Sequence, residues 1–303
     1  MAPEGMNPEC KLLSLRLATL PCKGMCSRAR LPSFYREGVG GGCWAAHTAL
    51  TLLEALDVLD QVKGVLRGKG LSLEDLLAAL LLHDTGKLTI DYVKYGFSQH
   101  NVLSAIISLD VLRRSSFAGE RFVISRAILL HHEYRMWREV FSNSILLSHF
   151  FQAIKAKRRV RLVDRSRAAL SSLEALVELI LGKAPLIELV TALSRRPEYH
   201  ARYGEILRIS TVAADYREVS KALTLYWFVQ LFDNRAASVR ESLRDYWRYS
   251  LMGLEGYASD PQMLANKILN KPNAKLNVLL TLLPRPAPPN FLPSPSERLA
   301  PRR

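Results

Sequence analysis

The stretch LLLHDTGK, residues 80–87, joins an apolar run to a polar turn. Its leucines continue the pattern of EDLLAALLL (74–82) and predict a helix, which Gly86 ends. His83 and Asp84 follow the last leucine directly, and imidazole and carboxylate are both ligands of transition metals. We therefore expect the helix to end on half of a metal site, with further ligands on neighbouring helices.

Helical patterns dominate the chain on both sides of this stretch. Apolar residues at three- and four-residue spacing predict helices over 44–65, 98–114 and 123–134, and more amphipathic segments follow. Ser72 and Asp75 form an acceptable start for the central helix. The sequence thus predicts an all-α protein with an irregular N-terminal segment (1–40), one helical domain (41–250), a small helical appendage (251–283) and a proline-rich tail (284–303).

Composition limits the function classes. The chain has 303 residues, nearly half of them apolar, so it can bury a core without disulfides. Its formal net charge of +14 indicates a polyanionic partner such as nucleic acid. The first residues carry only a short apolar patch, broken by charges and by Pro21, which is neither a good signal peptide nor a membrane span. We expect a cytoplasmic protein with no membrane partner.

The four cysteines lie in the N-terminal part, away from the histidines: Cys10, Cys22, Cys26 and Cys43. Cys22 and Cys26 could bind a metal together with Cys10 or Cys43, but no matching second pair follows. We interpret all four as reduced structural thiols.

Histidines are concentrated on the first four predicted helices, among apolar residues. A lone histidine there is more often a hydrogen-bonded core residue than a ligand. Five buried imidazoles are costly unless each finds a partner, and metal ions supply partners to all of them. The five are His47, His83, His100, His131 and His132. The other two, His149 and His200, are interpreted as structural or surface residues.

A site rich in imidazole and carboxylate suits divalent transition metals, and Mn, Co, Ni, Fe, Zn and Mg all remain open. Two such ions, about 4 Å apart, can clamp a phosphodiester and activate water at neutral pH. The histidine and aspartate pattern therefore predicts phosphoester hydrolysis with two metal ions.

The ordered strings HDTGK (83–87), HNVLSAI (100–106) and AILLHHEY (127–134) resemble the HD superfamily of metal-dependent phosphohydrolases. They are most similar to the stand-alone HD nuclease of CRISPR interference, the Cas3'' type, over about residues 47–238. The resemblance implies a nuclease for single-stranded DNA whose partners are a separate helicase chain and a CRISPR RNA-guided surveillance complex. The sequence contains no Gly-x-x-x-x-Gly-Lys-Ser/Thr phosphate loop, so it carries no ATP-driven helicase of its own.

Carried over by position, the resemblance implies the metal ligands His47, His83, Asp84, His100, His131, His132 and Asp233. Asp215 is the rival of Asp233 for the last position. Asp84 would be shared between the metals, and Lys87 would approach the substrate phosphate or orient the attacking water. The alternative for Lys87 is a surface lysine that caps a helix. Gln99 and Asn101 stand where relatives often have glycine and glutamate, so hydrogen bonding around His100 should differ.

A basic stretch, residues 155–167, holds seven cations against one aspartate. It is either a solvated face or a ridge that binds the DNA backbone. The candidate ridge residues are Lys155, Lys157, Arg158, Arg159 and Arg161. Tyr134, Trp137 and Phe141 could stack on bases, although ordinary core packing is the commoner role of such residues.

Two other functions share this fold. An HD phosphohydrolase of free nucleotides, of the dNTPase or nucleotidase type, would need a pocket closed around base and sugar. A non-catalytic HD-fold subunit would bind nucleic acid or partner proteins, but it has no physical need for five buried histidines.

Overall fold

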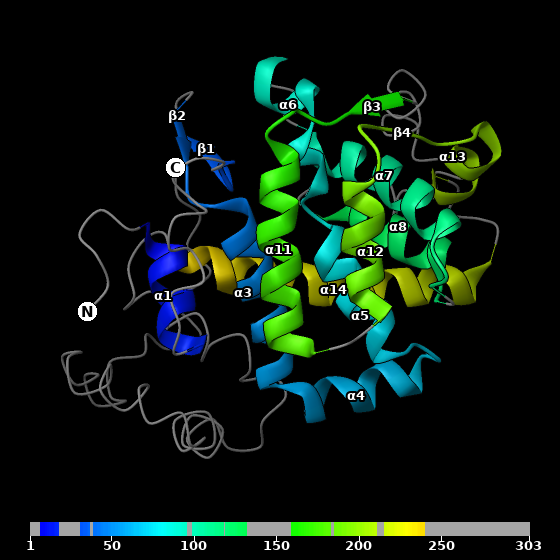
Figure 1. Cartoon of the computed structure of the whole chain (residues 1–303). Helices are drawn as coiled ribbons and strands as arrows, with labels where there is room; N and C mark the ends of the chain where they lie inside the picture. Colours follow the sequence, from blue (N-terminus) through cyan, green and yellow to red (C-terminus); the bar gives the residue numbers. More distant parts are fainter. Residues whose placement is uncertain are drawn as a thin grey trace, which may run out of the picture.

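The computed structural model describes residues 7–17, 31–36, 39–95, 99–117, 119–131, 159–182, 185–210 and 215–239. These residues form a bundle of helices with two short sheets at its edge (Figure 1). The all-α prediction is confirmed. The predicted appendage (251–283) and the proline-rich tail (284–303) lie outside the described residues.

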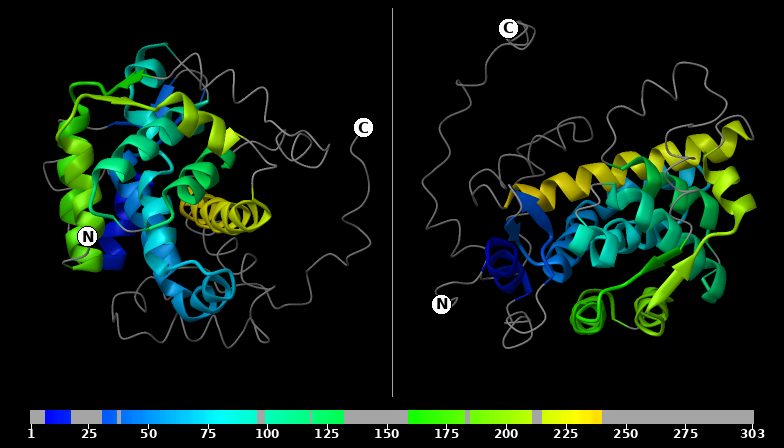
Figure 2. Two further views of the ribbon diagram at one scale, coloured as in Figure 1. Left: turned by 90° about the vertical axis from the view of Figure 1, so that its right-hand side faces the viewer. Right: turned by 90° about the horizontal axis from the view of Figure 1, so that it is seen from above.

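The bundle has three layers, which the two views of Figure 2 separate. A middle layer holds α3 (Trp44–Asp57), α5 (Leu73–Leu82), α7 (His100–Arg114) and α8 (Arg121–Leu130). The pair α11 (Ser166–Leu181) and α12 (Pro185–Ser194) covers one side of it, and the long helix α14 (Tyr216–Ser238) covers the other. Shorter helices lie around these layers: α4 (Leu59–Gly68), α6 (Ile90–Tyr95) and α13 (Tyr203–Ser210).

The central helix is α5. The predicted start is confirmed, because Ser72 Oγ accepts a hydrogen bond from Asp75 N at 3.0 Å and Asp75 Oδ2 accepts one from Ser72 N at 2.8 Å. The helix is buried from Asp75 to Leu82, which explains why it is apolar on every face. It ends at Leu82, earlier than the glycine, and the chain continues through His83 and Asp84 into the 3₁₀ turn η1 (Thr85–Leu88).

Gly86 lets η1 lie directly against α7. A Cβ atom at this position would overlap the carbonyl oxygen of His100 and would lie 2.9 Å from Leu103 Cβ. Gly86 N donates a hydrogen bond to Ser104 Oγ at 2.8 Å. The glycine of HDTGK and the serine of HNVLSAI therefore hold the two strings together.

The N-terminal segment is more ordered than predicted. Residues 8–17 form helix α1 (Pro8–Leu17), and β1 (Phe34–Arg36) pairs antiparallel with β2 (Val39–Gly41). Helix α1 packs on α3 and buries Leu12 and Leu13. A ten-residue helix is marginal alone, so its stability depends on packing that the local pattern does not display.

Two further differences concern element boundaries. The single helix predicted over 44–65 is divided at Val58 into α3 and α4, which lets Val62 and Leu66 turn into the core. The sequence also gave no sign of β3 (Arg159–Arg161) and β4 (Glu198–His200), which pair antiparallel. Strands of three residues are too short for their alternation to be recognised. Among the described helices, none has the length and apolar character needed to cross a membrane.

Candidate metal centre

Six predicted site residues meet at one place in the bundle. They come from three helices and from the turns that follow α5 and α8: His47 on α3, His83 and Asp84 after α5, His100 at the start of α7, His131 after α8, and Asp233 on α14. Side-chain exposure among them is highest for His100, at 12%. The cluster is therefore enclosed, with α7 at its most accessible side.

A first set of donors consists of His47, His83, Asp84 and Asp233, whose ligand atoms lie within 4.8 Å of one another. His47 Nε2 is 2.8 Å from Asp233 Oδ1 and 3.6 Å from Asp84 Oδ2. His83 Nε2 is 3.5 Å from Asp84 Oδ2 and 3.6 Å from Asp233 Oδ1. These last two distances exceed an ordinary hydrogen bond and leave space for an ion between the atoms.

A second set consists of Asp84, His100 and His131. His100 Nε2 lies 3.2 Å and His131 Nε2 lies 3.7 Å from Asp84 Oδ1. Asp84 thus turns Oδ2 to the first set and Oδ1 to the second. One carboxylate lies between two groups of imidazoles, the arrangement of a bridging ligand.

Backbone carbonyls fix the orientation of two imidazoles. His83 Nδ1 lies 2.7 Å from Leu80 O, and His131 Nδ1 lies 2.6 Å from Ile128 O. A carbonyl oxygen only accepts, so Nδ1 carries a proton in each ring, and Nε2 is the nitrogen that faces the cluster and can bind a metal ion there. Two imidazole nitrogens that face buried carboxylates form a donor set suited to divalent transition metals.

The charges of the cluster are strongly coupled. Burial opposes the charge of Asp84, but Lys87 and His83 outweigh it and hold the pKa of Asp84 well below its usual range. Lys87 Nζ donates a hydrogen bond of 2.7 Å to Asp84 Oδ2. Burial also disfavours the charge of His83, yet Asp84 and Asp233 outweigh it and raise the pKa of His83. Burial and the Lys87 cation lower the pKa of His100 to about 4, so this imidazole is neutral at pH 7.

Lys87 itself is buried, with 5% of the residue exposed. The alternative of a surface lysine that caps a helix is therefore wrong. Its ammonium lies beside the carboxylate that both donor sets share, which agrees with a role at the centre rather than at the surface.

Glu9 completes the centre and was missed in the sequence. Its carboxylate is fully buried on α1, and Oε1 lies 3.6 Å from Nδ1 of His47, on the ring edge that faces away from the cluster. Glu9 accepts hydrogen bonds from Ser33 Oγ at 2.7 Å and from the backbone N of Cys43. A carboxylate at this distance behind a ligating histidine attracts the positive charge of the ring and so raises its basicity. A single glutamate in an apparently irregular segment gave no signal of this role.

Asn101 explains the unusual triplet around His100. Its Nδ2 donates a hydrogen bond of 2.7 Å to Leu129 O, next to the turn that carries His131. This contact ties the start of α7 to the end of α8. The two imidazoles of the second set are thereby held at a fixed separation.

Several predicted residues lie elsewhere. Asp215 caps the start of α14, where its side chain accepts a hydrogen bond of 2.8 Å from Arg217 N. This position is about 27 Å along the helix from Asp233. His200 is a surface residue on β4, as expected, with 48% of its side chain exposed. Cys10 and Cys43 are buried and belong to neither donor set.

Other predicted residues lie outside the described part of the chain: His132, His149, Cys22, Cys26, Lys155, Lys157, Arg158, Tyr134, Trp137 and Phe141. Of the predicted basic ridge, Arg159 and Arg161 are described. Both are exposed, and they lie on strand β3.

The segment that carries most of these donors is similar to a known domain. Residues 45–177 match an HD domain. The match includes His47, the HDTGK string, His100 and His131, and it supports a metal-dependent hydrolase of the HD superfamily. Glu9 and Asp233 lie outside the matched range, and it is the fold that adds them to the HD centre. Neither a curated protein nor a solved structure matches the chain significantly.

Proposed function

We propose that the chain is a metal-dependent nuclease that hydrolyses phosphodiester bonds of single-stranded DNA. The observation that carries the proposal is the position of Asp84, which offers one carboxylate oxygen to each of two imidazole-rich donor sets. Two cation sites that share a carboxylate are suited to phosphodiester hydrolysis, because one cation can stabilise the attacking oxygen and the other the leaving oxygen.

His47, His83, Asp84 and Asp233 would hold one divalent ion, and Asp84, His100 and His131 would hold the second. Bound there, such ions supply Lewis acidity toward the phosphodiester oxygens and toward water at neutral pH. Glu9 lies behind His47, the Leu80 and Ile128 carbonyls orient His83 and His131, and the described helices bury the cluster, with His100 as its most exposed member.

Lys87 is the cation of the chain that we assign to the substrate. Its Nζ is 2.7 Å from Asp84 Oδ2 and is held by a buried turn. An ammonium at this point attracts a phosphate oxygen that enters the centre.

The ordered strings further lead us to propose a role in CRISPR interference as a stand-alone HD nuclease. In this proposal a helicase on a separate chain and an RNA-guided surveillance complex deliver the single strand. The excess of basic residues favours a polyanionic strand over a small nucleotide as the substrate.

The test is a digestion with defined metals. The protein is stripped with chelator, and Mn, Co, Ni, Mg or Zn is restored singly before labelled single-stranded DNA, duplex DNA, RNA or free dNTPs are added. We expect loss of single-stranded DNA with wild type plus metal, and none with Asp84→Ala. Phosphate release from dNTPs with DNA left intact would instead assign the protein to the nucleotide hydrolases.

A further inference from the structure

We propose a second site on this protein, an arginine-lined pocket that binds the phosphate backbone of a single nucleic-acid strand. The pocket has a volume of about 200 Å³ and lies between the C-terminal ends of α7 and α12 and strand β4. Arg114, Arg195 and Arg196 line it, with Asp110 and Tyr199 at their base. The proposal extends the proposed nuclease function by giving the strand a path outside the metal centre.

The positive charge of this pocket is available to a ligand. Its carboxylate, Asp110, is buried and already paired. It accepts hydrogen bonds from the Arg113 guanidinium and from Arg114 Nε, the latter at 2.7 Å. Arg195 and Arg196 are exposed and form no ion pair with any described residue. Because guanidinium groups bind phosphate oxygens in bidentate geometry, unpaired arginines in a concave site favour phosphate as the ligand.

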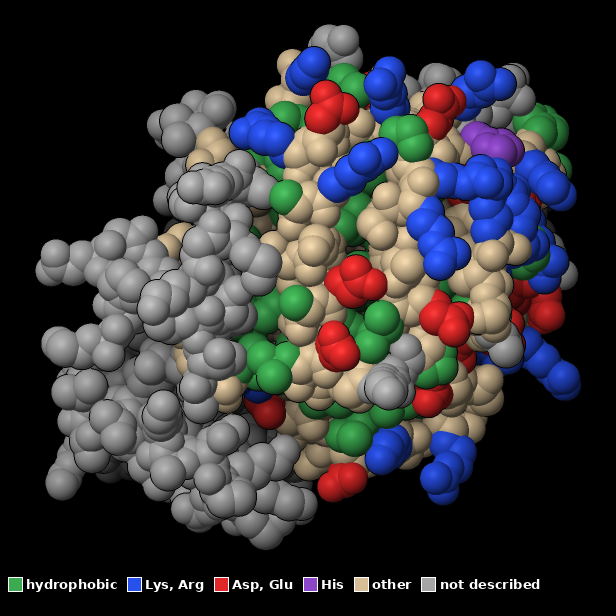
Figure 3. Space-filling view, viewed as in Figure 1, with side chains coloured by type: hydrophobic (Ala, Val, Ile, Leu, Met, Phe, Trp, Pro, Cys, Tyr) green, Lys and Arg blue, Asp and Glu red, His purple; other side chains and the backbone are tan. Residues whose placement is uncertain are grey.

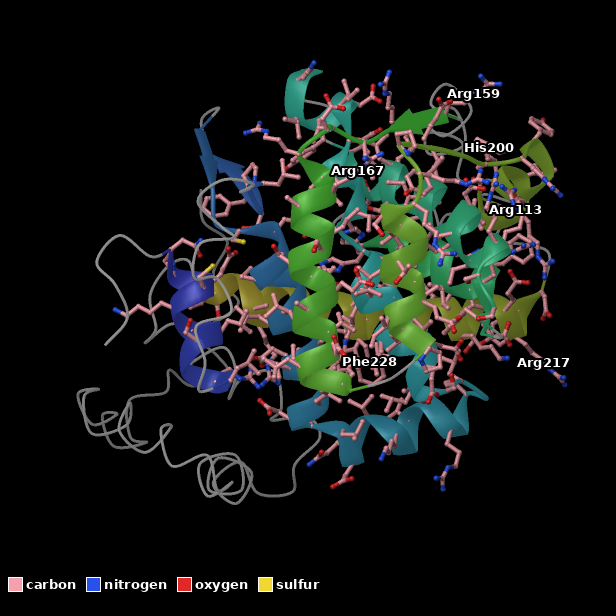
Figure 4. The ribbon with its side chains drawn as sticks, in the orientation of Figure 1. Arg113, Arg159, Arg167, His200, Arg217 and Phe228 are labelled. Atoms are coloured by element: carbon pink, nitrogen blue, oxygen red, sulfur yellow. The ribbon has the colours of Figure 1, made fainter. Side chains whose placement is uncertain are left out.

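The neighbouring sheet continues the basic surface. Residues alternate across a strand, so Val160 and Tyr199 face the core while Arg159, Arg161 and His200 share the exposed face with one carboxylate, Glu198, which lies opposite Arg161. Figure 4 shows Arg159 and His200 side by side on this sheet. Figure 3 shows basic side chains gathered around the exposed histidine at the same end of the molecule.

Helix α7 connects the pocket to the metal centre. His100 begins the helix and Arg114 ends it, so the two lie about 21 Å apart along its axis, the length of about six nucleotides in a stacked strand. Leu162, next to the end of β3, pairs with Thr89 just after the turn that carries Lys87. The exposed arginines of β3 therefore lie between the pocket and the catalytic turn.

A strand of nucleic acid is a better occupant than an acidic protein. The cations here are all arginines, they come from the end of α7, the segment after α12 and strand β3, and β3 leads toward a centre suited to phosphodiesters. An acidic peptide would bring carboxylates to these arginines but would have no reason to continue toward the metal centre.

The experiment measures binding apart from cleavage. A fluorescein-labelled 20-nucleotide single strand is titrated with metal-free protein in EDTA, and anisotropy is followed at several salt concentrations. Arg195→Ala/Arg196→Ala and Arg159→Ala/Arg161→Ala should each weaken binding about tenfold or more and reduce the salt slope by about 1.4, the value for two lost phosphate contacts. The control, Lys63→Ala/Arg67→Ala, removes the same charge from exposed positions of α4 at the opposite end of the molecule (Figure 1) and should bind as wild type.

Four results would overturn the proposal: no binding by wild type, unchanged binding by both arginine pairs, equal losses in the control and the sheet or pocket variants, or competition by polyglutamate as strong as by unlabelled DNA. Cleavage assays on the same proteins separate this proposal from the nuclease. Variants that lose binding while wild type cuts nothing would leave the pocket standing and remove the nuclease. Wild-type cleavage together with unchanged binding by both arginine variants would leave the nuclease standing and remove the pocket.

Discussion

Single residues decide whether the buried charges of the centre are balanced. Asp84 is fully buried, and Lys87 is the cation that contacts it at 2.7 Å. Loss of one partner from a buried ion pair leaves the other charge uncompensated, which costs several kcal/mol.

We predict that Lys87→Met lowers the unfolding free energy of the metal-free protein by about 3 kcal/mol, because Asp84 then lacks its cation. Added Mn should restore much of this loss, since a bound ion supplies the missing charge. Urea unfolding followed by circular dichroism measures both effects. Lys63→Met, at an exposed position of α4, is the control and should change stability by about 0.5 kcal/mol or less. Equal stability of the two variants would contradict the assigned ion pair.

Glu9 is predicted to act on metal affinity through His47. Glu9→Gln keeps the shape of the side chain but removes its charge, and it should weaken the affinity of the first donor set by about 10- to 100-fold. Isothermal titration with Mn measures this, and Lys11→Gln, an exposed position on the same helix, provides the comparison. Unchanged affinity in the Glu9 variant would mean that the 3.6 Å contact has no effect on the ligand.

At the scale of elements, the close contact of η1 with α7 positions His100 relative to Asp84. We predict that Gly86→Ala displaces the turn, because its Cβ would overlap the His100 carbonyl, and that both melting temperature and metal affinity fall. Gly64→Ala on α4 meets nothing within 4 Å and should instead stabilise the protein by about 0.5–1 kcal/mol. Calorimetric melting of the two variants checks the contrast. A Gly86 variant as stable as wild type would show that the turn has room to move.

The elements also show how far the sequence could be read. The continuous apolar run of α5 and the capping pair Ser72–Asp75 were sufficient to place that helix. The break at Val58 and the helix α1 were not predicted, because both depend on contacts between segments distant in the chain. The strings around His83, His100 and His131 revealed their ligands, whereas Glu9 became recognisable only when α1 was seen to pack beside α3.

At the scale of the whole molecule, the first donor set joins residues from distant parts of the chain. A buried ion network supports this: Glu54 on α3 binds Arg16 of α1 at 2.7 Å and Arg235 of α14 at 2.8 Å. Arg235 lies two residues after Asp233, so the network fixes the part of α14 that carries the ligand. The N-terminal helix and α14 are thereby parts of the centre, although both lie outside the matched HD segment.

We therefore predict that Asp233→Asn reduces the affinity of the first donor set, whereas Asp215→Asn does not. Asparagine caps a helix as well as aspartate does, so the second variant preserves the start of α14. Equilibrium dialysis with Mn distinguishes the two. Loss of metal in the Asp215 variant alone would reverse the assignment.

The most direct measurement is the metal content of the intact protein. Protein reconstituted with Mn and passed through a desalting column is analysed by inductively coupled plasma mass spectrometry, alongside Asp84→Ala. The shared carboxylate predicts two ions per chain in wild type and a loss from both donor sets in the variant. Absence of bound metal in wild type, or full occupancy without Asp84, would contradict a metal centre built around this residue.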